Sequence, residues 1–443
     1  MERCHWNRTR HLAFDDPSHA SRRIQRRGAV RIRRRRARRR RARLRATARR
    51  ADRRRVANRA SGDGRFCASR AESPDARVSP RRHGIDEMRV NMDFGSENTS
   101  PVHPAFAQAI VAANDGYATN FEAEQWTERA LDALREFFGT NELCAFTVST
   151  GTAANAIALG AMTPPYGAIL CHWDAHIATD ECGAPEMYSF GARQIPLAGE
   201  HGRISPEALS SQVREARFGV VHAVQPSVLS LTNLTEAGTA YTPDEIAALT
   251  RVAHEAGLAT HLDGARFANA AAFLDVSPAQ LSWKCGVDVI TLGTTKSGSF
   301  GAETIVAFTS KYNTALAFLR KRGGHFVPKS RFLGAQIETY VQDGLWLANA
   351  RHANRAARRM SEGLAQVDGV TLVHPTEGNE VFVAMPDTMV NALAAAGCKF
   401  QRDWRLHPRH HRFVTSWATA DEDVDRLLGV CRSASSAHFR ATP

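Results

Sequence analysis

Two polar clusters in the middle of the chain contain residues that could act together in one reaction. In HLDGAR, residues 261–266, Asp263 ends a strand-like run, and in TLGTTKSG, residues 291–298, Lys296 follows another. A carboxylate such as Asp263 can keep an aromatic ring nitrogen protonated, and a lysine amine can form a Schiff base with an aldehyde. Lys296 follows Asp263 by 33 residues. This order and spacing indicate a cofactor that carries an aldehyde on a pyridine-type ring.

A turn upstream of these clusters could bind the phosphate of such a cofactor. Residues 144–160, CAFTVSTGTAANAIALG, have the pattern of a strand, a tight turn at Ser149, Thr150, Gly151 and Thr152, and a helix. Unpaired backbone N–H groups and the positive end of the helix dipole make a helix start an anion site. Ordinary N-capping by Ser or Thr is the alternative role of this turn. Taken together, the three segments predict a pyridoxal-phosphate enzyme.

Residues near these clusters are candidates for supporting roles. Arg266 could reach the phenolic oxygen of the cofactor or a substrate carboxylate, or it could form a structural ion pair with Asp263. His176 follows the strand-like run YGAILC and could stack on the cofactor ring and act as a general base. His172 competes for that role, and a capping or core role is the alternative for both histidines.

Candidates also lie near the two ends of the chain's body. Ser96, in FGSENTSPVHP, could bond a substrate carboxylate, and Arg412, in RHHRFVTSWAT, is suited to a bidentate carboxylate clamp. Lys329 and Arg331 follow a glycine pair and could contact a phosphate or a subunit interface. A solvated surface charge is the alternative for each of them.

The pattern around these residues is typical of an α/β fold. Helices are expected over residues 104–114 and 122–139, the second ending at Gly139 as a C-cap. Further helical stretches separate apolar runs that predict strands at residues 144–149, 166–171, 218–225, 258–263, 287–293 and 301–308. Such alternation predicts a mainly parallel sheet with helices on both faces. The segment between the strands expected at 287–293 and 301–308 is too short for a helical crossover, so the strand at 301–308 is expected to run antiparallel.

The pattern changes after about residue 330. Residues 331–367 predict long amphipathic helices, and VTLVHP, EVFVAMP and HRFVTSW predict strands. We therefore expect an N-terminal segment and large domain over residues 88–330, and a connecting helix with a smaller α+β domain over residues 331–443.

Positive charge is concentrated at the start of the chain. The whole chain has a net charge of +13, but residues 1–87 hold 29 arginines, no lysine and nine acidic residues. This Arg-rich tail is expected to be disordered in isolation. It could be a basic arm for nucleic acid, a targeting peptide, or upstream DNA translated from an early start codon. We favour the third interpretation, with Met88 as the natural start, because the rest of the chain uses lysine freely.

The cysteines and the hydropathy exclude several classes of protein. Eight cysteines form no CxxC pair, which predicts neither a disulfide framework nor a metal site. No apolar run approaches the roughly 20 residues that span a bilayer. We expect reduced thiols in a cytoplasmic protein that binds neither a metal nor a membrane.

Residues 91 to about 430 resemble the L-threonine aldolase family, which has the aspartate-aminotransferase-type fold. The matches are STGTAAN, the DAH around His176, HLDGARFANA, the lysine in TTKSG, GGH with SRFLGAQ, and RFVTSWAT. The resemblance implies a seven-stranded large domain and a homodimer or homotetramer with active sites between subunits. It also implies cleavage of a β-hydroxy-α-amino acid, such as L-threonine, L-allo-threonine or phenylserine, to glycine and an aldehyde.

The resemblance also implies roles for individual residues. Lys296, His176 and Asp263 would be catalytic, with Lys296 as the Schiff-base lysine, His176 stacked on the ring and Asp263 on the pyridine nitrogen. At the phosphate, the implied contacts are Gly151, Thr152 and, from a neighbouring subunit, Arg331. Carboxylates would be bound by Ser96, Arg266 and Arg412, and Arg266 would also contact the cofactor.

The chain departs from the family pattern at two places. Many members have an acidic Tyr-Gly-Asp-Asp-like motif where this chain reads YATNFEAE from Tyr117, and many have glycine where it has Ser297. A bulky or aromatic β-substituent is therefore a possible preference. The alternatives are a β-eliminating lyase or another carbon–carbon lyase on the same cofactor, a binding relic without activity, and a nucleic-acid-binding protein that uses the tail.

Overall fold

The computed structural model describes residues 92–402, 405 and 409–441 of the 443-residue chain. These residues all belong to one compact unit, residues 85–443. The Arg-rich tail and the start expected at Met88 lie outside the described residues.

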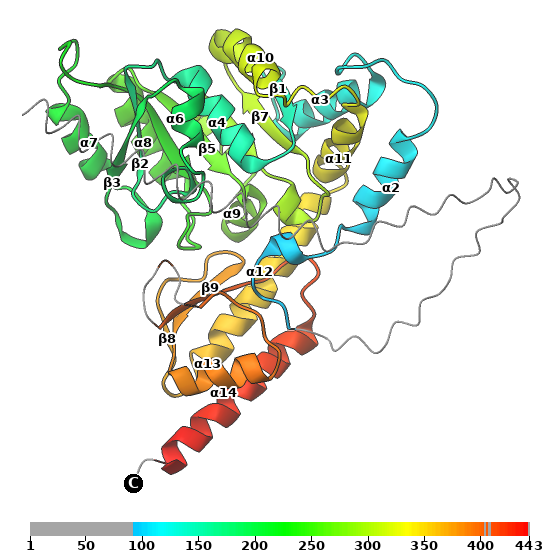
Figure 1. Cartoon of the computed structure of the whole chain (residues 1–443), viewed down its shortest axis with the longest axis vertical. Coiled ribbons are helices and arrows are strands. Elements are labelled where there is room, and N and C mark those ends of the chain that lie inside the picture. The colour runs from blue at the N-terminus through cyan, green and yellow to red at the C-terminus, as the bar shows by residue number, and fades with distance from the viewer. Residues whose placement is uncertain (1–91, 403–404, 406–408, 442–443) are drawn as a thin grey trace, which may run out of the picture. The chain divides into compact units, whose positions relative to one another are not determined.

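A seven-stranded sheet contains the strands between residues 144 and 307 (Figure 1). The strand order is β1-β7-β6-β5-β4-β2-β3, and only β7 runs antiparallel to its neighbours. The predicted α/β fold, the mainly parallel sheet and the antiparallel last strand are confirmed. The strands are β1 Cys144–Val148, β2 Gly167–His172, β3 Arg193–Leu197, β4 Gln225–Thr232, β5 Ala259–Gly264, β6 Val289–Leu292 and β7 Glu303–Ala307.

One strand prediction is wrong. Residues 218–225 were expected to form a strand, but residues before Gln225 form turns and the strand β4 follows them. Phe218, Val220 and Val221 are exposed, so the apolar run that suggested a buried strand is not buried. The strand that does form includes Ser230, a polar residue that makes a buried hydrogen bond to a histidine.

Helices cover both faces of the large sheet because both faces of its strands are apolar. In β4, Leu229 packs in a core with α3, α8, α9 and α11, whereas its neighbour Val228 packs in a core with α4 and α10. The helices of this part are α2 Pro104–Ala113, α3 Gln125–Phe138, α4 Gly151–Met162, α5 His176–Thr179, α6 Ala184–Tyr188, α7 Pro206–Glu215, α8 Pro243–Glu255, α9 Phe267–Leu274, α10 Asn313–Arg322 and α11 Arg331–Val341. Gly139 ends α3 in the left-handed conformation, as predicted for a C-cap.

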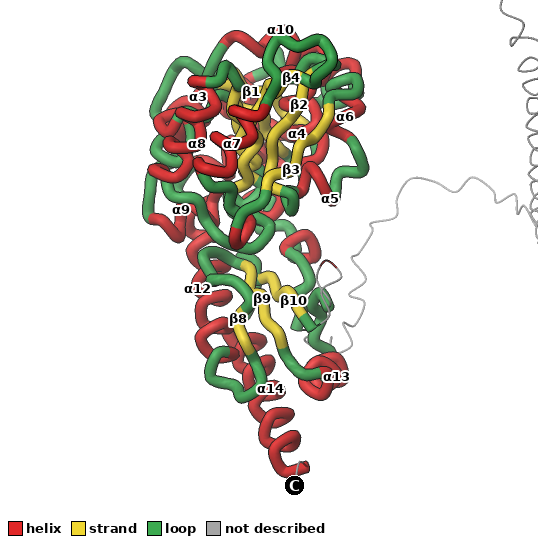
Figure 2. Tube along the Cα trace, turned by 90° about the vertical axis from the view of Figure 1, so that its left-hand side faces the viewer, coloured by secondary structure: helices red, strands yellow, loops and turns green. Residues whose placement is uncertain are grey.

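The C-terminal part contains a second, antiparallel sheet with the order β10-β9-β8 (Figure 2). Its elements are α12 Leu345–Leu364, β8 Thr371–Leu372, β9 Glu380–Ala384, α13 Asp387–Ala395, β10 His410–Val414 and α14 Asp421–Ala441. Gly344, with a φ of 70°, separates α11 from α12 within the predicted helical stretch. Met92 and Phe94 belong to the core of this sheet, so the N-terminal segment packs with the C-terminal part.

Across the described ranges, no helix is both long and apolar enough to cross a membrane.

Candidate active site

The predicted chemical residues meet at one edge of the large sheet. Asp263 lies at the end of β5, Lys296 lies in the 3₁₀ turn η4 (Thr295–Ser297) that follows β6, and α4 begins at Gly151 after β1. Because β1, β5 and β6 point in the same direction, their carboxyl ends share this edge, where open α/β sheets bind ligands. A cavity of about 440 Å³ opens there and is lined by Gly151, Thr152, His176, Asp263 and Lys296.

Asp263 is a buried hydrogen-bond acceptor in the cavity wall. Its Oδ2 accepts a bond of 2.8 Å from Nδ2 of Asn155, and its Oδ1 accepts one of 3.0 Å from the backbone N–H of Ala265. Both oxygens are therefore held in place while the side chain still faces the cavity. This arrangement is suited to holding a protonated ring nitrogen.

Asn155 connects Asp263 to a chain of buried hydrogen bonds. Its Oδ1 accepts a bond of 2.6 Å from the Thr291 hydroxyl, which in turn lies 2.8 Å from Nε2 of His261. Burial lowers the pKa of His261 to about 4, so this histidine is neutral near pH 7. Since Thr291 donates to Asn155, Nε2–H of His261 donates to Thr291 and Nδ1 accepts from the Ser230 hydroxyl at 3.0 Å. The directions in this chain fix the amide of Asn155 with its N–H groups toward Asp263.

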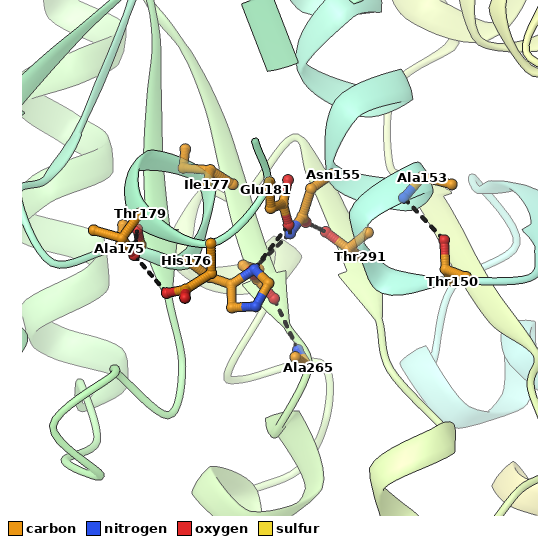
Figure 3. A network of polar contacts seen from close by, with 12 residues as sticks. Thr150, Ala153, Asn155, Ala175, His176, Ile177, Thr179, Glu181, Ala265 and Thr291 are labelled. Carbon is orange, nitrogen blue, oxygen red and sulfur yellow. Dashed lines mark hydrogen bonds and ion pairs between the residues drawn. The ribbon is translucent and has the colours of Figure 1, made fainter. Parts of the chain in front are cut away.

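His176 begins α5 and lines the same cavity. Its Nδ1 lies 3.0 Å from Oε1 of the buried Glu181, which also accepts a 2.9 Å bond from Asn155, as Figure 3 shows. Burial by itself lowers the pKa of His176, but the bond to Glu181 and the charges of Glu236 and Asp263 outweigh it and raise that pKa. His172 bonds the backbone at Gly199 and Asp174 and does not line this cavity.

The start of α4 offers unused backbone donors. Thr150 is the N-cap and accepts a 3.2 Å bond from the N–H of Ala153 (Figure 3). The N–H groups of Gly151 and Thr152 have no acceptor among the described residues. A Cβ added at Gly151 would meet no heavy atom within 4 Å. The turn therefore both caps the helix and leaves two donors and open space for an anion.

Lys296 is partly buried, and its amine makes no hydrogen bond or ion pair within the described part of the chain. Two buried carboxylates, Glu97 and Glu303, interact with it electrostatically. The amine thus faces the cavity without a fixed partner, as a lysine that binds an aldehyde requires.

The two candidate arginines lie in a buried ion-pair cluster. Arg266 contacts Glu97 at 2.6 Å and Glu380 at 3.2 Å, and Arg412 contacts the same oxygen of Glu380 at 3.0 Å. Neither arginine lines the cavity. Glu97 connects the cluster to the cavity because its charge acts on Lys296.

The other candidates also lie off the cavity wall. Ser96 caps a short turn by accepting a bond from the N–H of Asn98, and Asn98 itself lines the cavity. Arg331 begins α11 and donates a 3.0 Å bond to the carbonyl of Gly116, and Lys329 is exposed.

Asn155, Glu181 and Glu303 are cavity residues that sequence reasoning did not single out. The sequence offers an indication for Asn155, because it is a polar residue within an alanine-rich helical stretch. Across the described residues, no group of three or more His, Cys, Asp and Glu side chains is arranged to hold a metal ion.

The donor set fits pyridoxal phosphate. One cavity is lined by three kinds of group: a buried carboxylate with both oxygens restrained, an unpaired amine, and two free backbone N–H groups. These groups match a ring nitrogen, an aldehyde and a phosphate, respectively. The cavity volume is within the range of small-molecule sites.

The chain is similar to threonine aldolases over most of its length. Residues 93–388 match the sequence model of the family described as beta-eliminating lyase. The low specificity L-threonine aldolase of Pseudomonas aeruginosa is 39% identical over 340 residues, which cover 76% of this chain and 96% of that protein. The solved threonine aldolase of Leishmania major has a TM-score of 0.72 at 25% identity, over 77% of this chain and 98% of that one. A serine palmitoyltransferase solved with PLP shares the fold, with a TM-score of 0.60 at 17% identity over 78% of this chain and 88% of that one.

Proposed function

Since this chain belongs to the beta-eliminating lyase family and, within it, to the L-threonine aldolases, we propose that it cleaves β-hydroxy-α-amino acids to glycine and an aldehyde. It is a lyase that depends on pyridoxal 5′-phosphate. The observation that carries the proposal is the shared cavity of Asp263, Lys296 and the free start of α4.

We assign the cofactor contacts from the positions of these groups. Lys296 would hold the aldehyde covalently, Asp263 would hold the ring nitrogen, and Gly151 and Thr152 would hold the phosphate, since all four line the cavity. Arg331 of a neighbouring subunit joins the phosphate site if the family arrangement applies. When bound, the cofactor supplies an electron sink for the electrons of the broken Cα–Cβ bond.

His176 is the proposed base for the β-hydroxyl proton. Nδ1–H of His176 donates to Glu181, which leaves Nε2 as the proton acceptor. The carboxylate raises the pKa of His176 and so makes the imidazole a stronger base. An ordered water is the alternative base.

We propose Ser96, Arg266 and Arg412 as the residues that recognise the substrate carboxylate. Support comes from Glu97, which follows Ser96 in the chain, pairs with Arg266, and has a charge that acts on both Arg412 and Lys296. The guanidinium donors of an arginine match a carboxylate in fork geometry, and those of Arg266 bind the carboxylate of Glu97 in this way.

We further propose a cytoplasmic homodimer or homotetramer. Phe300 lies four residues after Lys296 and is largely exposed, as is Phe318 on α10. Exposed apolar side chains of this size are covered when a second subunit packs on them.

A β-eliminating lyase acting on the same cofactor is the second candidate, because the family model carries that description. The products separate the two activities. An aldolase releases glycine and an aldehyde, whereas an eliminating enzyme releases ammonia and a keto acid.

Replacing Lys296 by Ala is expected to abolish turnover, because no other lysine lines the cavity within the described residues. The measurement is glycine and aldehyde release from threonine and phenylserine. Borohydride reduction followed by peptide mass mapping should place the cofactor on Lys296 in the unmodified protein. Lys284→Ala, at an exposed position on the 3₁₀ turn Trp283–Cys285, is the control and should retain activity. A Lys296→Ala protein with near-native rates would refute the assignment.

A further inference from the structure

Glu303 is a buried carboxylate in the cavity wall to which the mechanism above assigns no role. It is the first residue of β7, the antiparallel strand between β1 and β6, and its side chain is directed at the turn that follows β6. Only 6% of Glu303 is exposed, yet it lines the same cavity as Lys296. Glu303 is thus a buried acid in the same cavity wall as the amine of Lys296.

The carboxylate of Glu303 holds the lysine turn by three hydrogen bonds. Oε2 accepts a 3.2 Å bond from the N–H of Thr294, and Oε1 accepts a 3.2 Å bond from the N–H of Thr295 and a further bond from the Thr295 hydroxyl. These N–H groups lie at the start of η4, where no partner exists within the turn. Glu303 therefore caps the turn from a neighbouring strand and restrains the direction of Lys296.

The same carboxylate carries a charge that acts on Lys296 without contacting it. Among the described residues no ion pair within 4 Å joins the two, and both oxygens of Glu303 accept hydrogen bonds from the turn. Burial raises the pKa of Glu303 to about 7, although the hydrogen bonds from Thr295 and the charge of Lys296 oppose this. The acid therefore changes its charge near neutral pH.

Other charged groups face the same space and must be considered. Glu97 acts on Lys296 from the N-terminal segment. The remaining titratable groups of the cavity wall are His176, Asp180, Glu181, Glu236 and Asp263, and the bound phosphate adds another charge. A neutral substitution at Glu303 leaves all of them in place.

We propose that Glu303 is a positioning residue that fixes the turn carrying Lys296 and supplies the negative charge that keeps a proton on the Lys296 nitrogen when the cofactor is attached. The inference rests on the proposed attachment of pyridoxal phosphate at Lys296. As pH rises, Glu303 becomes an anion, and an anion close to a positive nitrogen raises the pH at which that nitrogen loses its proton.

The test separates the charge from the hydrogen bonds. Glu303→Gln keeps the size and a carbonyl acceptor but removes the charge, whereas Thr295→Val keeps the charge and removes the hydroxyl donor. The pH midpoint of the cofactor's absorbance change in the loaded protein reports the protonation of the Lys296 nitrogen. We expect Glu303→Gln to lower this midpoint by about one pH unit and Thr295→Val to change it much less. Glu303→Asp should recover most of the wild-type midpoint.

Cofactor affinity provides a second readout that does not need activity. Titration of the apoprotein, followed by protein fluorescence, should show weaker binding in both Glu303→Gln and Thr295→Val, because each loses part of the cap. Glu255→Gln, at an exposed end of α8, makes the same chemical change far from the cavity and should alter neither readout. A midpoint in Glu303→Gln equal to that of the wild type would overturn the charge role, and unchanged affinity in both variants would overturn the positioning role.

Failure of the inference and failure of the proposed function give different results. If borohydride mapping places no cofactor on Lys296 in the wild type, the proposed function fails and the inference fails with it. If mapping places the cofactor on Lys296 and Glu303→Gln shifts nothing, only the role of Glu303 is wrong.

Discussion

Asn155 carries no charge, yet its amide lies between the carboxylates of Glu181 and Asp263 and donates to both. Burial and the charge of Asp263 raise the pKa of Glu181, while the hydrogen bonds from His176 and Asn155 oppose this rise. Thr291 fixes the amide from its other side. The neutral amide of Asn155 thus binds both Glu181, the partner of His176, and Asp263 in the same cavity wall.

The pH profile of kcat/KM should report the pairing of His176 with Glu181. A base works only when neutral, so the rate falls as pH drops through the pKa of His176, which lies above its ordinary value. Glu181→Gln removes one of the groups that raise this pKa, while Glu236 and Asp263 remain, so the acid limb is expected to move to lower pH by about one unit. Glu142→Gln, an exposed substitution of the same kind, should leave the limb in place. An unmoved limb in Glu181→Gln would exclude His176 as the group that titrates there.

Some of these residues could be predicted from sequence and others could not, for a physical reason. Asp263 and Lys296 were predictable because few residue types suit a ring nitrogen and an aldehyde, and each follows a strand-like run. The role of Asn155 depends on Asp263, which lies 108 residues away, and that of Glu303 on a turn held by a neighbouring strand. Neither contact can be predicted from the sequence until it is known which strands pair with one another.

At the scale of elements, the turn after β6 depends on close packing as well as on its cap. Gly298 ends η4 with a φ of 105°, and its carbonyl accepts a 2.8 Å bond from the N–H of His103. A Cβ at this position would lie 2.8 Å from Nε1 of Trp417. The turn therefore requires glycine both for its backbone conformation and for its contact with the C-terminal part.

Gly298→Ala should displace the turn that carries Lys296. We expect a loss of about 2 kcal/mol in unfolding free energy from the strained backbone and clearly weaker cofactor binding. Urea denaturation and fluorescence titration of the apoprotein would measure the two effects. Gly429→Ala is the matched control, because Gly429 lies within α14 with nothing near its Cβ, and it should be neutral or stabilising. Equal effects of the two substitutions would show that the turn tolerates a side chain.

Element prediction succeeded where burial and apolarity coincide. The strands β6 and β7 are short, mainly apolar runs that are buried throughout, and each was expected. β4 was misplaced because its buried residues include Ser230, whereas the exposed residues before it include Phe218 and Val221. Tertiary contacts, rather than local propensity, decide which of two adjacent segments joins a sheet.

At the scale of the whole described structure, one buried cluster joins three parts of the chain. Glu97 comes from the N-terminal segment, Arg266 from the large domain after β5, and Glu380 and Arg412 from the C-terminal sheet. Charges removed from water are stable only while each has its partner. The cluster therefore specifies how these parts pack together.

Removing one member of this cluster should lower the free energy of unfolding. Glu380→Leu leaves Arg266 and Arg412 with too little negative charge, and we expect unfolding free energy to fall by about 3 kcal/mol. Chemical denaturation would measure the change. Asp275→Asn, which breaks the exposed pair with Arg351 at 3.0 Å, should cost less than about 1 kcal/mol. A Glu380→Leu protein as stable as this control would show that the cluster does not specify the packing.

The cavity is assembled from the ends of strands that are far apart in the chain, so it cannot exist in a partly folded molecule. A ligand of this cavity therefore binds only the folded protein, and the free energy of binding adds to the stability of the folded state. At a ligand concentration of 100 times the dissociation constant, this linkage contributes about 2.7 kcal/mol. The stability of the folded protein thereby rises with the supply of its coenzyme.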